Sequence, residues 1–355
     1  MKQNSISGPS RRVIFRCDGG IGLGYGHIAR CQTLARALSS AGWACEFAVS
    51  GETAKLAMWN RSSFPLLVLD EPHDPACLVK LIDVASDLVV IDHYELDARY
   101  EDAMRNVAAT RFVFEDTPGR YHNAEILLDA AHGRSAEAYQ DLVSGTCRLL
   151  LGSDYVLLAP ELHEKRQDIL TGQKVSEDVS NVFVCFGGMD GNKFVIDALR
   201  ALDLVDQQLS VDVAIGAGAR HLPEILDLAE ISHQDVTIHQ DCSYVADLLA
   251  NADIALGAGG VNAWERCFLG VPSIVACAAE NQLDLCNTVV NHGVALGVVE
   301  PGIGATAAMH ELLGTLLEDT LLRQNMSNAA LHFCNGMGAR NIVSAIEETV
   351  SQNAI

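Results

Sequence analysis

Short apolar segments alternate with helical patterns along most of the chain. They fall into two series, one between residues 13 and 128 and the other between residues 182 and 276. Strands that alternate with helices in this way predict parallel sheets with covering helices. We expect the strands at Val13–Arg16, Ala44–Val49, Leu66–Leu69, Leu88–Ile91, Arg111–Phe114, Ile126–Leu128, Val182–Phe186, Val211–Ile215, Val236–His239, Ile254–Leu256 and Ser273–Ala276.

A polar stretch without strong periodicity separates the two series, and we interpret it as a linker over residues 166–180. The expected division is an N-terminal Rossmann-like domain over residues 1–165 and a C-terminal Rossmann-like domain over 181–334. A closing helix over 335–355 should pack near the domain junction. The pattern predicts an α/β protein of two similar halves, with the ligand in the cleft between them.

The first strand leads into a glycine-rich turn and then a helix, and His27 stands where the turn meets the helix. Glycine suits a backbone that turns sharply or approaches a ligand, and a helix N-terminus offers N–H groups to an anion. The helix end also disfavours a second positive charge, so His27 should stay neutral and able to accept a proton. The pattern suggests catalysis on a phosphorylated ligand. A histidine hydrogen-bonded within the turn for structural reasons is the alternative.

A dinucleotide-binding turn is a rival explanation for the same glycines. That fingerprint needs a third small residue, where this chain has Tyr25 or His27 depending on the register. It also needs an acidic residue at the end of the second strand, where Ser50 and Gly51 stand instead. Nicotinamide or flavin binding is therefore not expected, and no cofactor is predicted.

A second glycine-rich turn follows the strand at Ile254–Leu256. Gly259 and Gly260 precede a helix that should begin near Asn262, and the free N–H groups at the start of this helix are a candidate binding site for a diphosphate. Glu265 could accept hydrogen bonds from a ribose diol. Alternatively, Asn262 caps the helix and Glu265 is its partner in a capping box.

Polar residues follow other predicted strands as well. Asp92 and Tyr94 come directly after Leu88–Ile91, where α/β sheets bind ligands, although a buried aspartate could merely anchor a loop. Glu115 and Asp116 are interpreted as a solvated strand end. His73, His122, His132, His163 and His292 lack the spacing of metal ligands, so no metal site is predicted.

Composition narrows the function classes. The 355-residue chain is 49% hydrophobic and 20% charged, and its net charge of −22 argues against non-specific nucleic-acid binding. No apolar run is long enough for a membrane span, so no stable membrane insertion is expected. The first residues lack the apolar core of a signal peptide, and eleven scattered cysteines without a CxxC motif fit reduced thiols. These features predict a cytoplasmic protein.

Several motifs in this order resemble the nucleotide-sugar hydrolases of pseudaminic acid biosynthesis, which release UDP from UDP-2,4-diacetamido-2,4,6-trideoxy-β-L-altropyranose. That pathway makes a sialic-acid-like sugar used in flagellin glycosylation. The family in turn resembles GT-B glycosyltransferases in fold. The matching runs are Arg16–Arg30, which contains GYGH, IDHY at Ile91–Tyr94, LLGSDYVLLAPEL at Leu150–Leu162, FGGMD at Phe186–Asp190, GAGGVNAWER at Gly257–Arg266, ENQ at Glu280–Gln282 and NGMGARNIV at Asn335–Val343.

The resemblance implies a metal-independent hydrolysis of a UDP-activated 6-deoxy-diamino sugar. His27 is then the base that activates water for attack on the anomeric carbon, with inversion. The implied substrate-binding residues are Gly24, Tyr25, Gly26, Asp92, Tyr94, Gly187, Gly188, Gly259, Gly260, Asn262, Glu265, Asn281 and Gln282. A GT-B glycosyltransferase that uses a UDP-sugar and an acceptor other than water is the alternative.

The chain departs from the family pattern at three places. Asp18-Gly19-Gly20 stands where a serine-rich turn is common, and Val261-Asn262 stands where hydroxyl residues are common. Ala159 replaces a frequent arginine, which removes a possible phosphate partner. The sugar is the part of the assignment that these departures affect most.

Overall fold

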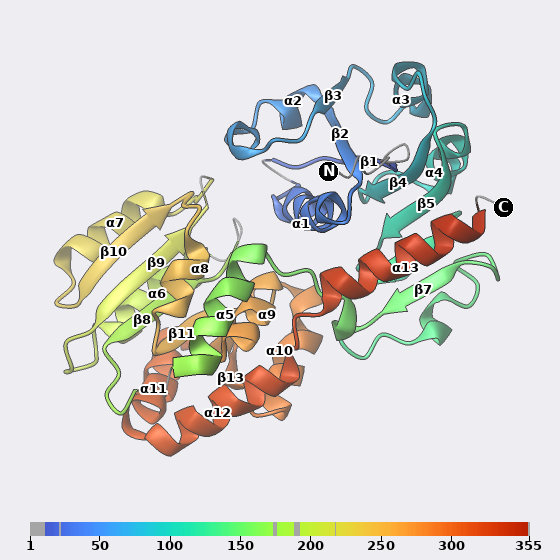
Figure 1. Cartoon of the computed structure of the whole chain (residues 1–355). Coiled ribbons are helices and arrows are strands. Elements are labelled where there is room, and N and C mark those ends of the chain that lie inside the picture. Colours follow the sequence, from blue (N-terminus) through green and yellow to red (C-terminus); the bar gives the residue numbers. More distant parts are fainter. Residues whose placement is uncertain (1–10, 21–22, 173–175, 188–191, 217, 354–355) are drawn as a thin grey trace, which may run out of the picture. The chain divides into compact units, whose positions relative to one another are not determined.

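The chain folds into two compact units, and each carries one parallel sheet (Figure 1). The computed structural model describes residues 11–20, 23–172, 176–187, 192–216 and 218–353. Unit 1 comprises Met1–Leu157 and Met337–Ile355, and unit 2 comprises Leu158–Gly336. No helix within the described part of the chain is long and apolar enough to cross a membrane.

Unit 1 is built on a seven-stranded sheet in the order β3-β2-β1-β4-β5-β6-β7, and every neighbouring pair is parallel. Except for Ala44 and Ala109, the apolar side chains of β1, β2, β4 and β5 are fully or almost fully buried, because helices cover a doubly wound sheet on both faces. The strands are β1 (Arg12–Cys17), β2 (Ala44–Ser50), β3 (Leu66–Leu69), β4 (Ser86–Asp92), β5 (Ala108–Phe114), β6 (Ile126–Asp129) and β7 (Arg148–Leu151).

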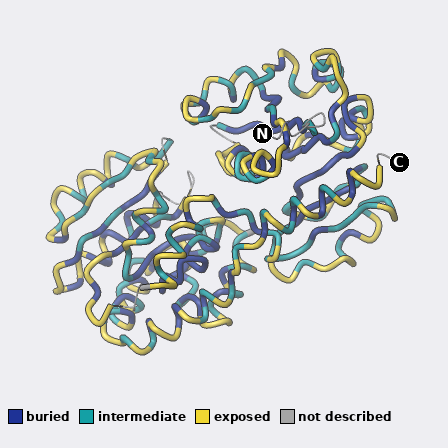
Figure 2. The backbone as a smooth tube through the Cα atoms, in the orientation of Figure 1, coloured by how far each residue is buried: buried dark blue, intermediate teal, exposed yellow. Residues whose placement is uncertain are grey.

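Unit 2 repeats this design with a six-stranded parallel sheet in the order β10-β9-β8-β11-β12-β13. The prediction of two Rossmann-like parallel sheets is therefore confirmed. Figure 2 shows the buried strands inside each unit and the exposed outer faces of the helices. The strands are β8 (Asn181–Cys185), β9 (Ser210–Ile215), β10 (Asp235–Gln240), β11 (Ile254–Ala258), β12 (Ser273–Ala276) and β13 (Ala295–Val299).

Helices alternate with strands from β1 to β5 and from β8 to β13, as the pattern of apolar positions predicts. In α1, the predicted apolar stripe of Ile28, Cys31, Leu34, Ala35 and Leu38 is buried. The helices are α1 (Gly26–Ser40), α2 (Gly51–Ala54), α3 (Pro75–Leu81), α4 (Ala98–Ala103), α5 (Pro160–Gly172), α6 (Asn192–Leu202), α7 (Leu222–Ile231), α8 (Val245–Ala250), α9 (Val261–Leu269), α10 (Leu283–Asn291), α11 (Ala305–Glu318), α12 (Thr320–Phe333) and α13 (Gly338–Asn353).

The last helix, α13, belongs to unit 1 although it follows unit 2 in sequence. Ile342 and Ile346 are fully buried in the cluster that contains Phe15 and Phe47 of the sheet. A Cβ atom at Gly338 would lie 2.0 Å from the carbonyl oxygen of Val156. Glycine at this position therefore lets the start of α13 approach the backbone of unit 1.

Three predicted features differ from the structure. The segment expected as a linker over residues 166–180 is helical in its first part, because α5 extends to Gly172. Its polar sequence carries only a weak apolar stripe, which hid the helix. The sequence does not predict the edge strands β7 and β13, since both are partly exposed; β7 has only three apolar residues after Arg148, and Gly297 interrupts the apolar run of β13.

Candidate functional site

The carboxyl ends of β1 and β4 form the topological switch point of unit 1. The chain leaves β1 toward β2 on one side, whereas β4 leads to β5 on the other. Cys17, the last residue of β1, pairs with Asp92, the last residue of β4. Ligands of open α/β sheets bind outside such a point. Polar side chains that follow β1 and β4 are therefore in the expected position for a site.

His27 and Asp92 form a buried pair at this point. His27 lies in the first turn of α1, with 7% of its surface exposed, and Asp92 is completely buried. Their Nδ1 and Oδ1 atoms are 2.6 Å apart. Among the described residues, the side chains that donate hydrogen bonds to Asp92 all belong to α1, so Asp92 fixes the first turns of that helix rather than a loop.

Arg30 connects this pair to a second carboxylate. Its Nε and Nη2 atoms donate to the two oxygens of Asp92, each at 2.6 Å, and Nη1 donates to Asp116 Oδ1 at 2.6 Å. The guanidinium also lies over the ring of Phe114, 4.7 Å from the ring centre. A bidentate contact and a stacked ring fix both the position and the plane of the cation.

The network keeps Asp92 ionised. Burial alone would raise the pKa of this carboxyl, but the charge and hydrogen bonds of Arg30, with the hydrogen bond of His27, hold that pKa well below its usual range. An ionised carboxylate can only accept hydrogen bonds, so His27 Nδ1 is the donor. In the neutral form of the ring, the Nε2 atom of His27 is then the one that carries the lone pair. In the described part of the chain it has no hydrogen-bond partner.

Tyr94 lies beside His27 and contacts the same network. Its ring meets the imidazole edge-on, with ring centres 4.6 Å apart, and its hydroxyl donates to Asp116 Oδ2 at 2.9 Å. Burial raises the pKa of Tyr94, and the negative charge of Asp116 adds to that effect. The phenol therefore stays protonated and can donate a hydrogen bond.

A second network, built on the buried residues Glu115 and His122, holds the loop that carries Tyr94. Arg120 donates to the backbone carbonyls of the loop at residues 93, 94 and 96, and its Nε binds Glu115 at 2.9 Å. His122, fully buried, lies between Glu115 and Glu101 at 2.9 and 2.7 Å. This network connects β5 and α4 to the loop, so the half-buried Arg120, held by the buried Glu115, helps to set the position of Tyr94.

Backbone hydrogen bonds join the two described sides of the glycine-rich turn before His27. Gly20 and Gly24 exchange two backbone hydrogen bonds of 2.9 Å, and Gly24 has a φ of +79°, which favours glycine. Tyr25 and Gly26 are exposed, and no side chain caps the start of α1. The first-turn N–H groups of α1 are therefore left for a ligand or for water.

Unit 2 has its own switch point, between β8 and β11. Gly187 follows β8 with a φ of +75°, and Gly259 and Gly260 follow β11. The predicted residue Gly188 lies outside the described residues. The glycines predicted to bind the ligand in this unit therefore follow β8 and β11, the two strands at the switch point. Ligands of open α/β sheets bind at the carboxyl ends of such strands.

The Asn262–Glu265 capping box is not formed. Gly260 is the N-cap and α9 begins at Val261, one residue earlier than expected. Asn262 instead donates through Nδ2 to Glu265 Oε2 at 2.7 Å and accepts from the buried Arg266 at 2.7 Å. Burial raises the pKa of Glu265. One carboxylate oxygen of Glu265 thus accepts a hydrogen bond from Asn262 of the same helix. This contact, and not a capping box, holds the Glu265 side chain.

The glycines of this second turn permit close packing. A Cβ atom at Gly257 would lie 2.2 Å from Nη1 of Arg266, and one at Gly259 would lie 2.2 Å from the sulfur of Cys286 on α10. Gln282 ends the short helical turn Glu280–Gln282 and accepts a hydrogen bond from the backbone of Ala278 at 3.2 Å. Asn281 belongs to the same turn, and its side chain lies outside what the structure describes.

The structure adds two residues to the site in unit 1. Asp116 was interpreted as part of a solvated strand end, but it binds both Arg30 and Tyr94, and its neighbour Glu115 is almost completely buried. Arg30 was not singled out either, although its place three residues after His27 puts both on one face of α1. The predicted residues His27, Asp92 and Tyr94 do lie together.

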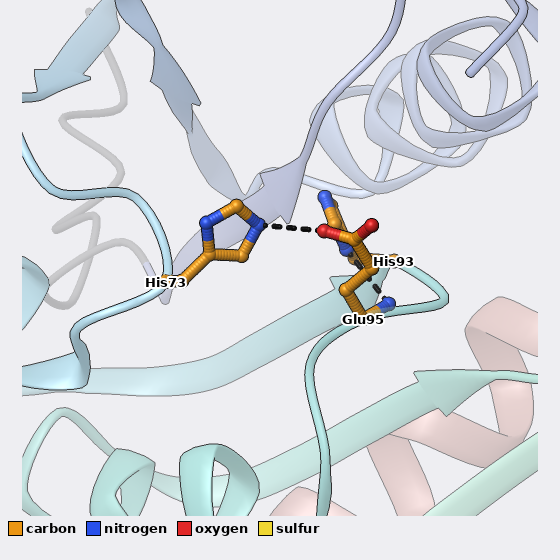
Figure 3. A group of neighbouring side chains, drawn as sticks. All are labelled: His73, His93 and Glu95. Atoms are coloured by element: carbon orange, nitrogen blue, oxygen red, sulfur yellow. Dashed lines mark hydrogen bonds and ion pairs between the residues drawn. The ribbon is translucent and has the colours of Figure 1, made fainter. Parts of the chain in front are cut away.

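A group of potential metal ligands lies next to this network. One ligand atom from each of His73, His93 and Glu95 lies within 4.8 Å of the other two (Figure 3). Burial lowers the pKa of His93 to about 4, and the positive charge of Arg16 contributes to this. Sequence spacing gave no sign of the group, because His73 follows β3 and the other two follow β4.

Comparison with known proteins places the chain among distant relatives. No protein-family model matches it. A spore coat polysaccharide biosynthesis protein of Bacillus subtilis is 22% identical over 343 residues, which cover 94% of this chain and 97% of the relative. The UDP-2,4-diacetamido-2,4,6-trideoxy-β-L-altropyranose hydrolase of Campylobacter jejuni is 21% identical over 271 residues, which cover 76% of this chain and 93% of the relative.

Solved structures agree on the architecture. A UDP-glucosyltransferase from Polygonum tinctorium superposes with a TM-score of 0.65 at 14% identity, and the match covers 98% of this chain and all of that one. The two parallel-sheet Rossmann-like domains therefore have the GT-B fold, as the sequence predicted.

Proposed function

We propose that the protein hydrolyses a UDP-activated sugar at the anomeric C–O bond, with His27 as the general base. The observation that carries this proposal is the buried His27–Asp92 pair at the switch point of unit 1. Asp92 takes the proton-bearing Nδ1, which leaves the basic Nε2 of His27 free to accept a proton from water.

The proposed reaction balances without a cofactor. A water molecule gives a proton to His27 Nε2 while its oxygen attacks the anomeric carbon. The bond between that carbon and the diphosphate oxygen breaks, and UDP leaves with the bonding electrons. Attack from the face opposite UDP inverts the anomeric configuration. General-base help of this kind contributes about 10²- to 10⁴-fold, and the anionic Asp92 stabilises the imidazolium that forms.

The residues of unit 2 are proposed to hold UDP. The N-terminus of α9 after Gly259 and Gly260, and the turn at Gly187–Gly188, would offer N–H groups to the diphosphate and stabilise the charge of the leaving group. The carboxylate of Glu265 would accept hydrogen bonds from the ribose, with one oxygen held by Asn262. Asn281 and Gln282 would contact the sugar-phosphate region.

The residues of unit 1 are proposed to bind the sugar. Gly24, Tyr25 and Gly26 form an exposed turn with no side chain at two of the three positions, so a sugar and a water molecule can approach His27. Tyr94 would donate its hydroxyl hydrogen to Asp116 and present its ring to the sugar.

The proposed substrate is UDP-2,4-diacetamido-2,4,6-trideoxy-β-L-altropyranose or another UDP-activated 6-deoxy-diamino sugar. The matched motifs and the hydrolase of Campylobacter jejuni support this class. The second candidate is a glycosyltransferase with an acceptor other than water, which the likeness to a UDP-glucosyltransferase supports through the fold alone.

Turnover of the purified protein with the UDP-altropyranose compound tests the proposal. UDP and the free sugar should appear without any acceptor, and NMR should show an inverted anomeric signal in the first product. The variant His27→Asn should bind UDP but release almost no product. UDP release that depends on an added acceptor would support the transferase, and near-normal turnover by His27→Asn would contradict the assigned base.

A further inference from the structure

We propose that Arg266 is a positioning residue for nucleotide recognition: acting through Asn262, it holds the carboxylate of Glu265 in the orientation that accepts the ribose hydroxyls. This role rests on the UDP site proposed for unit 2 and adds to it a buried side chain that acts through its neighbours. Asn262, Glu265 and Arg266 lie on α9 at positions i, i+3 and i+4, so they share one face of the helix.

Arg266 is anchored at the carboxyl end of β11. Only 1% of its surface is exposed, and its Nη2 donates to the carbonyl oxygen of Ala258, the last residue of β11, at 2.9 Å. Gly257 leaves room for the guanidinium, because a Cβ atom at that position would collide with Nη1. The guanidinium therefore has a fixed place between the strand and the helix.

The orientation of the Asn262 amide follows from this anchor. A guanidinium can only donate hydrogen bonds, so the atom of Asn262 that lies 2.7 Å from Nη1 of Arg266 must be the amide oxygen. The amide nitrogen Nδ2 is then turned toward Glu265, and it donates to Oε2 at 2.7 Å. The reversed amide would place two donors against each other and two oxygens against each other. Arg266 thus selects one of the two amide orientations.

Glu265 is left with one oxygen held and one oxygen available. Oε2 accepts from Asn262, whereas Oε1 has no hydrogen-bond partner in the described part of the chain. Burial raises the pKa of Glu265, while the hydrogen bond of Asn262 and the positive charge of Arg266 act in the opposite direction. Both neighbours therefore favour the ionised carboxylate, which accepts hydrogen bonds at both oxygens. A carboxylate already held at one oxygen also loses less rotational freedom when a ribose binds to the other.

Packing alone does not account for an arginine at this position. The Nε atom of Arg266 is buried and has no hydrogen-bond partner among the described residues. A buried donor without a partner destabilises a fold, and a well-packed apolar side chain often replaces a buried charged one without loss of stability. The orientation that Arg266 imposes on Asn262, and through it on Glu265, gives the arginine a role that an apolar side chain could not fill.

Calorimetric titration with UDP and with 2′,3′-dideoxy-UDP, which lacks both ribose hydroxyls, tests this role. The ratio of the two dissociation constants measures the ribose preference, and a general loss of binding leaves that ratio unchanged. The wild type should prefer UDP, and Arg266→Met and Asn262→Asp should each lower the preference at least about fivefold. In Asn262→Asp, Arg266 still meets an oxygen, but a second oxygen faces Glu265. Arg266→Lys, whose ammonium can also only donate, should keep more of the preference than Arg266→Met.

Arg200→Met is the matched control, because Arg200 on α6 of the same unit forms an exposed ion pair with Glu224 at 3.1 Å. It should keep the wild-type preference. If Arg266→Met does not fold, Arg266→Gln takes its place, because an amide accepts as well as donates and no longer selects one orientation of Asn262. A preference that is unchanged in the Arg266 and Asn262 variants, or affinities for the two ligands that fall equally, would overturn the role of Arg266. A wild type that does not bind UDP would contradict the proposed function and this role with it.

Discussion

His27 Nδ1 lies 2.6 Å from Asp92 Oδ1, at the point where the first and fourth strands of unit 1 end side by side. The carboxylate is fully buried and ionised, so it fixes which nitrogen of the imidazole carries the proton. The proposed chemistry follows from this contact, because it leaves Nε2 as the basic atom.

The substitution Asp92→Asn should reduce kcat by roughly 10²- to 10⁴-fold, since the amide no longer enforces the productive tautomer or stabilises the imidazolium. The affinity for UDP should stay within about twofold, because the proposed UDP residues lie in unit 2. Steady-state kinetics and calorimetric UDP titration give the two numbers. A parallel loss of UDP affinity would mean that Asp92 acts through the fold instead.

The substitution Arg30→Met should destabilise the protein by about 3–5 kcal/mol, because it leaves the carboxylate of Asp92 buried without its cation. Introduced into the variant Asp92→Asn, Arg30→Met should lower the free energy of unfolding much less than it does in the wild type, since a neutral amide costs less to bury without a cation. Denaturant unfolding of the four proteins forms the cycle. Additive losses would show that the two residues are not coupled.

Lowering the pH should reduce the free energy of unfolding, partly because Glu115 becomes protonated. Burial opposes ionisation, but hydrogen bonds from His122, Arg120 and two backbone N–H groups lower the pKa of Glu115 to about 2. A lowered pKa contributes stability that is present above the unfolded value, near 4.5, and is lost as the pH falls toward 2. The full contribution is about 3 kcal/mol.

The variant Glu115→Gln should therefore show a flatter decline of the unfolding free energy between pH 5 and pH 2 than the wild type. His122, whose pKa is raised by Glu101 and Glu115 against the effect of burial, adds stability in the opposite sense. That part is complete below about pH 6.5 and is lost at higher pH, as the ring deprotonates in the folded protein. Denaturant unfolding of both proteins from pH 2 to above pH 6.5 measures the two effects. An identical decline of the unfolding free energy between pH 5 and pH 2 in the two proteins would refute the role of Glu115.

The central strands could be predicted from the sequence because their apolar runs, such as Leu88–Ile91, are buried on both faces. The order of the strands could not be read from the same runs. That order decides which strand ends meet, so Asp92 could be placed at a strand end while its contact with His27 could not. Asp116 is the clearest example, since its role depends on β5 lying beside β4.

Glu265→Ala should weaken UDP binding about ten- to hundredfold, because a charged hydrogen bond to the ribose is lost. The control ligand is 2′,3′-dideoxy-UDP, which lacks both ribose hydroxyls, and its affinity is measured for the wild type and for the variant. The wild type should prefer UDP over this analogue, and the variant should bind the two almost equally. If the variant keeps the preference of the wild type, Glu265 does not contact the ribose.

The most direct test of the central claim is the fate of oxygen when the UDP-altropyranose substrate reacts in H₂¹⁸O without an acceptor. Attack of water at the anomeric carbon predicts unlabelled UDP, and ¹⁸O on the anomeric carbon of sugar analysed before it exchanges with solvent. It also predicts that His27→Asn forms neither product at a measurable rate. ¹⁸O in the nucleotide product, or no UDP release without an acceptor, would contradict the account.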